Sequence, residues 1–196
     1  YFMINKKGFT LLELVIVIGI LAVLGAVSVL VLNPAQLFAQ ARDTTRIEDM
    51  SVLRNALALY VSTISSPDMD TALDCSTSCF VHSTSVAPAA LCGARHVGAT
   101  VQTAARTVAG AGWIPVNFGA VPGGPALSVL PIDPTADATY FYSYACNNTS
   151  KTYELNANLE SDRYKAGGTE DKETNTKDGG NNDAVYEVGT DAGLDI

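Results

Sequence analysis

One apolar segment near the start of the chain constrains the fold more than any other feature of the sequence. Leu14 to Leu32 contains no charged residue and no proline, and Ser28 is its one strongly polar side chain. The segment is long enough to cross the hydrocarbon core of a bilayer, which takes about 20 helical residues. Lys6 and Lys7 precede it, and positive charge before a span favours a cytoplasmic N-terminus. We therefore expect one membrane-spanning helix and an extracytoplasmic remainder.

A cleaved secretory signal peptide is the alternative interpretation of this segment. The apolar core of a signal peptide is about 7–15 residues long. The apolar run here is longer, and no small-x-small cleavage site is followed by a polar mature start. The sequence therefore favours a segment that stays in the protein.

The residues after the span predict an amphipathic continuation of the helix. Asn33-Pro34 allows a helix to restart or kink, because Asn is a favourable N-cap and proline is tolerated at the first helical position. Apolar side chains then recur at helical spacing, with Arg46 and Asp49 on a polar side. The apolar positions are Met50, Leu53, Leu57, Tyr60, Val61 and Ile64. The pattern predicts a nearly continuous helix from Phe9 to Ile64.

Beyond this helix, the sequence predicts a loop-rich connection and then a small sheet. Residues 67–112 are rich in small residues and predict one short helix near 101–108. Segments of aromatic and β-branched residues are typical of strands. They lie at 113–118, 139–144, 152–157 and 184–188, and Cys146-Asn147-Asn148 is expected to join the second to the third as a hairpin. The expected fold class is α+β, with the long N-terminal helix packed on a small antiparallel sheet and a loop-rich C-terminal region.

The distribution of charge excludes one class of partner. The 196 residues carry a formal net charge of -8. Residues 1–64 carry a net of +1, which leaves -9 for residues 65–196. An acidic surface repels phosphate, so we expect no direct nucleic-acid binding by the extracytoplasmic part.

The chain has four cysteines, all beyond the apolar segment: Cys75, Cys79, Cys92 and Cys146. An even number of cysteines outside the cytoplasm favours disulfides. Four cysteines allow three pairings among which the sequence does not choose; a local Cys75–Cys79 pair would leave Cys92 for Cys146. His82 and His96 could complete a zinc site with these cysteines. The spacings are only loosely finger-like, and such zinc sites are mostly intracellular, so we expect disulfides.

The residues around the start of the span carry a family resemblance. Gly8-Phe9-Thr10-Leu11-Leu12-Glu13, after two lysines and before the apolar run, resembles the prepilin N-terminal signature of type IV pilins and type II secretion pseudopilins. The signature combines a cleavage glycine, an aromatic residue, a glutamate five places after the cut and a spanning segment. The strong resemblance covers roughly residues 5–61, and Leu130–Pro134 resembles a stretch of the major pseudopilin.

The resemblance implies a route of processing and assembly. A prepilin peptidase would cut between Gly8 and Phe9 and methylate the new amine of Phe9. The chain would divide into a cytoplasmic leader (1–8), a transmembrane and polymerisation helix (9–33), an amphipathic helix half (34–66) and an extracytoplasmic globular headgroup (67–196). The single-pass precursor would wait in the inner (cytoplasmic) membrane and then join a homo-oligomeric filament at the cell surface. The implied partners are the peptidase, an inner-membrane assembly platform and its cytoplasmic ATPase.

Glu13 places a carboxylate at the start of the apolar segment. Such a group in hydrocarbon costs at least ~2.5–3.5 kcal/mol, so a function is expected for it. Its candidate partner is the amine that cleavage would create on Phe9, one turn away in the same helix or in a neighbouring subunit. Low dielectric strengthens such a pair and penalises any register that leaves it unpaired. We therefore expect Glu13 to set subunit register; the alternative is that it snorkels to the cytoplasmic interface.

The C-terminal tail offers the candidate metal ligands. Asp178, Asn181 and Asp183 lie in a Gly/Asn/Asp-rich stretch of hard oxygen donors, which suit calcium. The major pseudopilins are similar in having a calcium-binding loop in their C-terminal region, and a plain solvated loop is the alternative. No other cofactor is expected. Neither histidine lies in a G-x-S-x-G motif and no phosphate loop is present, so we expect no enzymatic activity.

The predicted function is that of a structural subunit of a type IV pilus-like helical filament, assembled through its hydrophobic N-terminal helix after peptidase cleavage. A pseudopilin of a type II secretion system is the first alternative. A membrane-anchored binding module that does not polymerise is the second. The sequence does not decide among the three.

Overall fold

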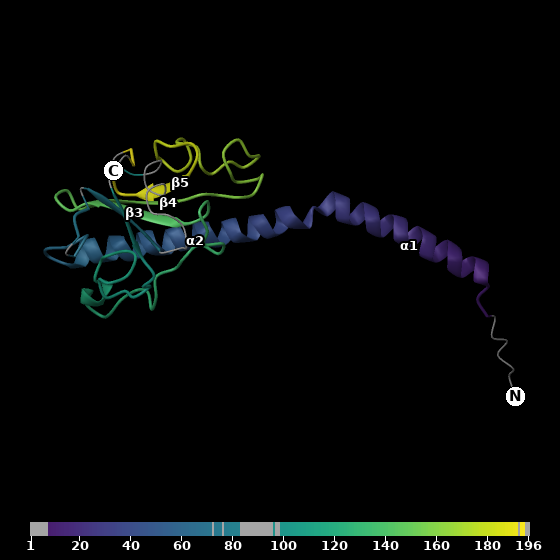
Figure 1. The fold of residues 1–196 in the computed structure, drawn as a ribbon, viewed down its shortest axis with the longest axis horizontal. Coiled ribbons are helices and arrows are strands. Elements are labelled where there is room, and N and C mark those ends of the chain that lie inside the picture. The colour runs from purple at the N-terminus through teal and green to yellow at the C-terminus, as the bar shows by residue number, and fades with distance from the viewer. Residues whose placement is uncertain are drawn as a thin grey trace, which may run out of the picture. The chain divides into compact units, whose positions relative to one another are not determined.

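The computed structural model describes residues 8–71, 73–75, 77–82, 96, 99–191 and 193–194 (Figure 1). The chain divides into two compact units, Tyr1–Phe38 and Ala39–Ile196. The first unit contains helix α1 (Leu11–Leu32) and the start of helix α2 (Pro34–Thr63). The second unit contains the remainder of α2 and a five-stranded sheet.

Helix α1 begins and ends at residues with recognisable capping chemistry. The Thr10 hydroxyl accepts a hydrogen bond from the Glu13 N–H, and the Glu13 carboxylate accepts one from the Thr10 N–H, which together form a capping box. Asn33 ends the helix in the left-handed region, with φ 39°, a conformation that asparagine tolerates better than most residues. Pro34 then opens α2. The predicted break at Asn33-Pro34 is confirmed.

The second unit buries one side of α2. The buried positions alternate at intervals of three and four residues, which is the spacing of one helix face. They are Ala39, Asp43, Arg46, Met50, Leu53, Ala56, Leu57 and Tyr60. The predicted apolar positions from Met50 to Tyr60 are therefore confirmed. The assignment of Arg46 to the polar side is wrong, because buried carboxylates neutralise it.

The sheet has the strand order β2-β1-β3-β4-β5. Its strands are β1 (Ser78–His82), β2 (Ala99–Thr103), β3 (Tyr142–Asn147), β4 (Thr152–Ala157) and β5 (Tyr186–Gly189). β1 and β2 are parallel, and the other neighbouring pairs are antiparallel. The α+β class is confirmed, and so is the hairpin that joins β3 to β4. The sheet is mixed, whereas the sequence predicted an antiparallel one.

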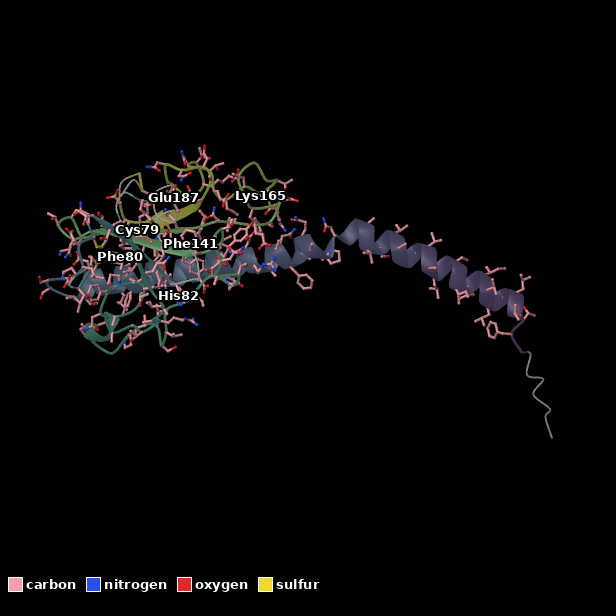
Figure 2. The ribbon with its side chains drawn as sticks, viewed as in Figure 1. Cys79, Phe80, His82, Phe141, Lys165 and Glu187 are labelled. Carbon is pink, nitrogen blue, oxygen red and sulfur yellow. A yellow bond between two sulfur atoms is a disulfide. The ribbon has the colours of Figure 1, made fainter. Side chains whose placement is uncertain are left out.

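The two faces of the sheet have different partners. Side chains on one face join those of α2 in the main apolar core, among them Phe80, Tyr144 and Leu155. Each large side chain buried in this way contributes about 1.5–3 kcal/mol. Cys79 lies in a second, smaller apolar cluster. Cys79 and Phe80 are consecutive in β1 (Figure 2), and successive strand residues point to opposite faces.

Two predicted elements are wrong. Residues 113–118 form no strand: Trp113, Ile114 and Phe118 are buried, but the segment makes one isolated bridge, Ala109↔Asn117, and runs into a short 3-10 helix. Pro115, which lacks an N–H, explains why an aromatic segment fails to join the sheet. The helix expected near 101–108 is replaced by β2 and an irregular segment.

Candidate processing and assembly site

The predicted cleavage bond lies in an open part of the chain. Gly8 and Phe9 directly precede α1 and belong to no helix or strand. The Phe9 side chain is 88% exposed, and a Cβ added to Gly8 would meet no atom within 4 Å. Exposed segments outside regular structure are preferred sites of proteolysis, because the backbone can enter a protease without unfolding its surroundings. The geometry is compatible with a cut here.

Glu13 is engaged by the first turn of its own helix. Its Oε2 accepts hydrogen bonds from the Thr10 N–H and from the Thr10 hydroxyl, each at 2.9 Å. Both donors lie one residue beyond Phe9, whose nitrogen would become the new amine after cleavage. The capping box therefore satisfies the carboxylate in the uncut chain and holds it at the N-terminal end of α1, next to Thr10.

Helix α1 presents apolar side chains in every direction. All of its described side chains are exposed, and Glu13 is the one charged residue in it. The helix that begins at Leu11 is long and apolar enough, by length and composition, to cross a membrane. Within the described residues no side chain of α1 is buried, which suits contact with lipid or with other proteins.

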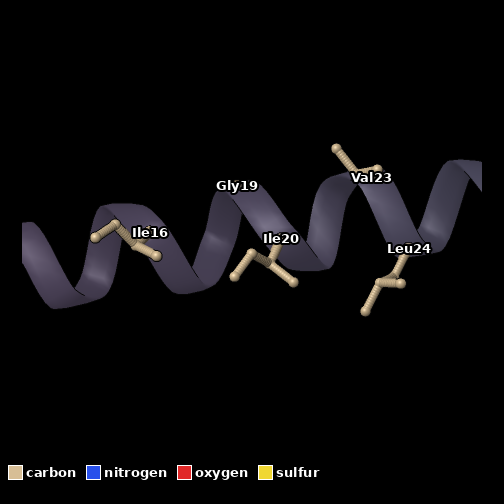
Figure 3. A pocket seen from close by; sticks show the side chains of 5 residues that line it. All are labelled: Ile16, Gly19, Ile20, Val23 and Leu24. Atoms are coloured by element: carbon tan, nitrogen blue, oxygen red, sulfur yellow. The ribbon is translucent and has the colours of Figure 1, made fainter.

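The surface of α1 is hollowed at Gly19. Ile16, Ile20 and Leu24 lie in a row along the helix, with Val23 beside them (Figure 3). Together with Gly19, these side chains line an open hollow of about 380 Å³. A Cβ at Gly19 would meet nothing within 4 Å, so the subunit's own packing does not require glycine there.

A buried arginine of α2 is hydrogen-bonded to the irregular segment that precedes β3 and contains Asp133. Arg46 donates to Asp133 through Nε at 2.7 Å and through Nη2 at 2.9 Å, and to Asp43 through Nη1 at 2.7 Å. All three side chains are at most 1% exposed. This two-point fork is the strongest geometry for an arginine and a carboxylate. Burial alone would lower the pKa of Arg46, but Asp133 and Asp43 raise it above its usual value.

The same part of α2 also connects to the start of the tail. The Asp43 carboxylate accepts hydrogen bonds from the backbone N–H groups of Glu160 and Ser161, at 2.9 and 2.8 Å. Arg42 forms an ion pair with Glu160. The hydrogen bond that Arg42 donates in this pair lowers the pKa of the Glu160 carboxyl. The sequence analysis missed this cluster, although Asp43 and Arg46 fall on the helical spacing of the buried face.

The cysteines pair differently from the local pairing considered above. Cys75 is joined to Cys146, with 5.1 Å between their Cα atoms, so a Cys75–Cys79 disulfide is wrong. The physical reason is that Cys75 and Cys146 both lie in the main core, whereas Cys79 lies in the cluster on the other face. Cys79 is also disulfide-bonded. Cys92 lies outside the described residues.

The disulfide also decides the zinc alternative at Cys75. Among the described residues, one group of potential metal ligands comes together: Asp70, Cys75 and Cys146. The two sulfurs in this group are bonded to each other. Zinc needs thiolate sulfur, which a disulfide does not supply. The group is therefore a disulfide beside a buried carboxylate.

His96 contacts the second face of the sheet. Its Nε2 lies 3.0 Å from the Ser143 Oγ, and its Nδ1 lies 3.5 Å from the Glu154 Oε1. The order serine, histidine, carboxylate is that of a hydrolytic triad. Ser143, however, is fully buried in the middle of β3, where no substrate could reach it. The arrangement serves to hold residue 96 against β3 and β4.

The predicted calcium ligands lie in the loop before β5. Asp178 accepts hydrogen bonds from the N–H groups of Gly180 and Glu187, and Asp183 accepts one from Asn175. Burial raises the pKa of Asp178, and the nearby Asp183 carboxylate contributes in the same direction. These oxygens thus close turns of the loop. Asn181 lies on the same loop, and calcium binding by the three residues stays a prediction.

Comparison with known proteins identifies the N-terminal segment. Residues 3–29 match the family model of the prokaryotic N-terminal methylation motif. Neither a curated protein nor a solved structure shows significant similarity to the chain. The matched residues include Gly8, Phe9 and Glu13, together with most of α1. With its apolar helix, the motif fits an inner-membrane-anchored precursor that becomes part of a surface filament. This protein carries the prepilin-type N-terminal signature of type IV pilins and pseudopilins.

Proposed function

We propose that the protein is a structural subunit of a type IV pilus-like filament, assembled through α1 after a prepilin peptidase removes residues 1–8. The observation that carries the proposal is that every described side chain of α1, an apolar helix, is exposed. In the precursor, lipid surrounds this helix. On assembly, equivalent helices of other subunits would replace the lipid, so one segment would serve as both anchor and polymerisation surface.

The residues proposed for peptidase processing and for subunit register lie at the N-terminal end of the same helix. The peptidase would cut between Gly8 and Phe9 and methylate the Phe9 amine. Glu13, already directed toward Thr10, would then have a cation available within its own first turn or from a subunit in place before it. A charged pair in hydrocarbon is strongly favoured over two separated charges. Such a pair would disfavour every register in which the carboxylate stays alone.

The partners of this function are the peptidase, an inner-membrane assembly platform and its ATPase. The second unit would form the extracytoplasmic surface of the filament. Its acidic residues make it a poor ligand for nucleic acid. The proposed role is structural, in keeping with the motif, which belongs to a group of generally non-enzymatic proteins.

The test uses two variants of the full-length chain in a host with an assembly system. Gly8→Val should block processing, because open space around Gly8 means that only the peptidase meets the added side chain. Gly19→Ala, also a glycine with open space, is the matched control and should be processed normally. Edman sequencing or mass spectrometry reads the N-terminus. If Gly8→Val still begins at Phe9, the assigned cut is wrong.

Glu13→Ala tests assembly separately from processing. The variant should be cut normally and stay in the membrane, with filament yield reduced by at least an order of magnitude. Thr10→Ala removes the other half of the capping box and controls for loss of helix capping, which costs about 1 kcal/mol. Normal filament yield from Glu13→Ala would exclude a role for this residue in register.

A type II secretion pseudopilin is the second candidate, because the same motif serves both classes. Deletion of the gene separates the two. Loss of surface filaments indicates a pilus, and loss of an exported enzyme with filaments intact indicates a pseudopilus. Crosslinking that recovers only monomers from the membrane would exclude both.

Calcium is a candidate ligand of the tail at Asp178, Asn181 and Asp183. If it binds there, chelation should lower the unfolding temperature of the full chain, because an ion that binds only the folded state stabilises it. Asp183→Asn should remove the response to the chelator. An unfolding temperature that does not change on chelation eliminates calcium.

A further inference from the structure

The β3–β4 hairpin ends in a lysine with an unusual backbone. Lys151 has a φ of 60°, in the left-handed region that lysine rarely adopts and that costs roughly 1–2 kcal/mol. Its N–H donates to the Asn147 carbonyl at 2.8 Å, which closes the turn. This conformation returns the side chain over the turn, so that Nζ lies 2.8 Å from the Asn148 Oδ1.

The side-chain amide of Asn148 is held by three further contacts. Its Oδ1 also accepts a hydrogen bond from the Met69 N–H at 3.1 Å. Its Nδ2 donates to the Asp70 Oδ1 at 2.9 Å and to the Asp68 Oδ1 at 3.3 Å. Donors thus surround the carbonyl oxygen and carboxylates surround the nitrogen, and the lysine amine lies 2.8 Å from the same carbonyl oxygen.

From this arrangement we propose that Lys151 and Asn148 form an intramolecular isopeptide bond, with release of ammonia. The Lys151 ammonium first loses a proton to solvent. The Nζ lone pair then attacks Cγ of Asn148, the new N–C bond forms, and the carbonyl electrons move onto Oδ1. When the carbonyl re-forms, the Cγ–Nδ2 bond breaks and ammonia leaves. The reaction joins an amine and a primary amide into a secondary amide, and it needs no oxidant or co-reactant.

Each step of this reaction has a protein group positioned to assist it. The Met69 N–H faces the oxygen on which negative charge develops, as in an oxyanion hole. Asp70 faces the leaving nitrogen and can supply its proton, then take up the one that Nζ gives up. Proximity of the reacting groups in a rigid turn replaces a collision in solution and is worth up to about 10⁵–10⁸ M in effective concentration.

Asp70 also has the protonation behaviour that a proton donor needs. Its residue is 8% exposed. Burial raises the pKa of Asp70, and a hydrogen bond with the neighbouring Asp68 carboxyl acts in the same direction. Two carboxyl groups that share a site hold one proton between them more tightly than either alone. A proton taken up by Asp70 would lie next to the leaving nitrogen.

The bond would close the turn that follows Cys146, whose disulfide joins the loop of residues 68–75 to β3. Asn148 binds the same loop through Met69, Asp68 and Asp70. A covalent turn would hold Lys151 in its strained conformation and remove a cleavage site for trypsin-like proteases from the tip of the hairpin.

The experiment is a mass and peptide map of the full-length wild-type chain. The intact mass should be lower than the sequence mass by one ammonia, beyond the hydrogens lost to disulfides. Trypsin should not cut after Lys151, and an amine-acetylating reagent should not modify it. Lys165, half exposed and paired with Asp162, is the internal control and should be cut and acetylated normally. Fragmentation should recover residues 148–151 as one crosslinked ring.

Two variants complete the test. Lys151→Arg keeps the positive charge and the hydrogen-bond donors but should retain the ammonia. Asp70→Asn should slow formation of the bond by about 100-fold or more, because it removes the proton donor. A wild-type chain whose Lys151 is cut by trypsin and acetylated would overturn the proposal. So would an equal loss of ammonia from Lys151→Arg, which would indicate cyclisation of an asparagine alone.

Discussion

Helix α1 and the part of α2 from Ala39 onward share a backbone conformation but differ in how their side chains are satisfied. Every described side chain of α1 is exposed, and its residues are apolar on all sides. The second segment buries one face, which includes two charged residues, Asp43 and Arg46. The helical stretch thus contains two kinds of segment. The exposed apolar side chains of α1 are available to partners outside the chain, whereas the buried face of α2 packs within its own unit.

In the proposed function, assembly and folding are therefore carried by separate parts of the sequence. Substitutions in α1 change side chains that are exposed in the isolated subunit, so they should affect assembly alone. Substitutions on the buried face of α2 remove contacts of the second unit, so they should affect its stability first. Three sets of substitutions probe the molecule in order of decreasing expected effect, and the comparison of Leu53 with Leu21 tests this separation directly.

Arg46→Met should have the largest effect on stability. It leaves Asp43 and Asp133 buried without a cation, which costs about 3–5 kcal/mol. Arg42→Met is the matched control: that ion pair is partly exposed, so its loss should cost only about 0–1 kcal/mol. Urea unfolding of the full chain in detergent measures both. Equal effects would mean that the buried fork contributes no more than the exposed pair.

Leu53→Ala and Leu21→Ala compare the two segments directly. Leu53 is fully buried in the core, so its truncation should cost about 2–5 kcal/mol. Leu21 is 61% exposed, so its truncation should leave the unfolding curve unchanged and lower filament yield instead. Val52→Ala, at an exposed position beside Leu53, should change stability by less than about 0.5 kcal/mol. A destabilised Leu21→Ala chain would show that α1 takes part in the fold of the subunit.

The raised pKa of Glu173 predicts a smaller effect on stability, which depends on pH. Burial raises the pKa of Glu173 from 4.5 to about 7, although its carboxylate accepts hydrogen bonds from the Leu159 and Ala166 N–H groups. Between these two values the folded state binds more protons than the unfolded state, so stability falls as pH rises from 4.5 to about 7. The loss amounts to at most about 3 kcal/mol.

Glu173→Gln should flatten this part of the pH profile, measured as urea midpoints at several pH values. Glu170→Gln is the control: a hydrogen bond from Arg163 lowers the pKa of that exposed carboxyl, so its contribution has the opposite sign. A profile unchanged by Glu173→Gln would show that the pKa of Glu173 is the same in the folded and the unfolded chain.

Local chemistry made part of the fold predictable from the sequence. The break between the helices follows from Asn33-Pro34, which end one helix and start the next through their own backbone preferences. The bounds of β4 follow from alternating residues next to a turn. The apolar face of α2 follows from its spacing. In the candidate site, the residues of the methylation motif are contiguous, so Gly8, Phe9 and Glu13 could be assigned without a structure.

What could not be predicted depends on contacts between distant residues. Arg46 meets Asp133 across 87 positions of sequence, and the local partner Asp43, three residues earlier in the helix, does not by itself indicate that the guanidinium is buried. Trp113 and Phe118 are buried in the apolar core although they lie in an irregular segment. That segment has the composition of a strand but not its hydrogen bonds. The Cys75–Cys146 pair depends on which face of the sheet each residue occupies.

The mass of the subunit recovered from sheared surface filaments tests the central claim most directly. The account predicts a chain that begins at Phe9, carries one methyl group on its new amine and has no free cysteine. Glu13→Ala cells should yield a chain processed at the same bond in the membrane, with its amount in the filament fraction reduced by at least an order of magnitude. A chain that retains residues 1–8 in filaments, or is absent from every filament preparation while processed in the membrane, would contradict the account.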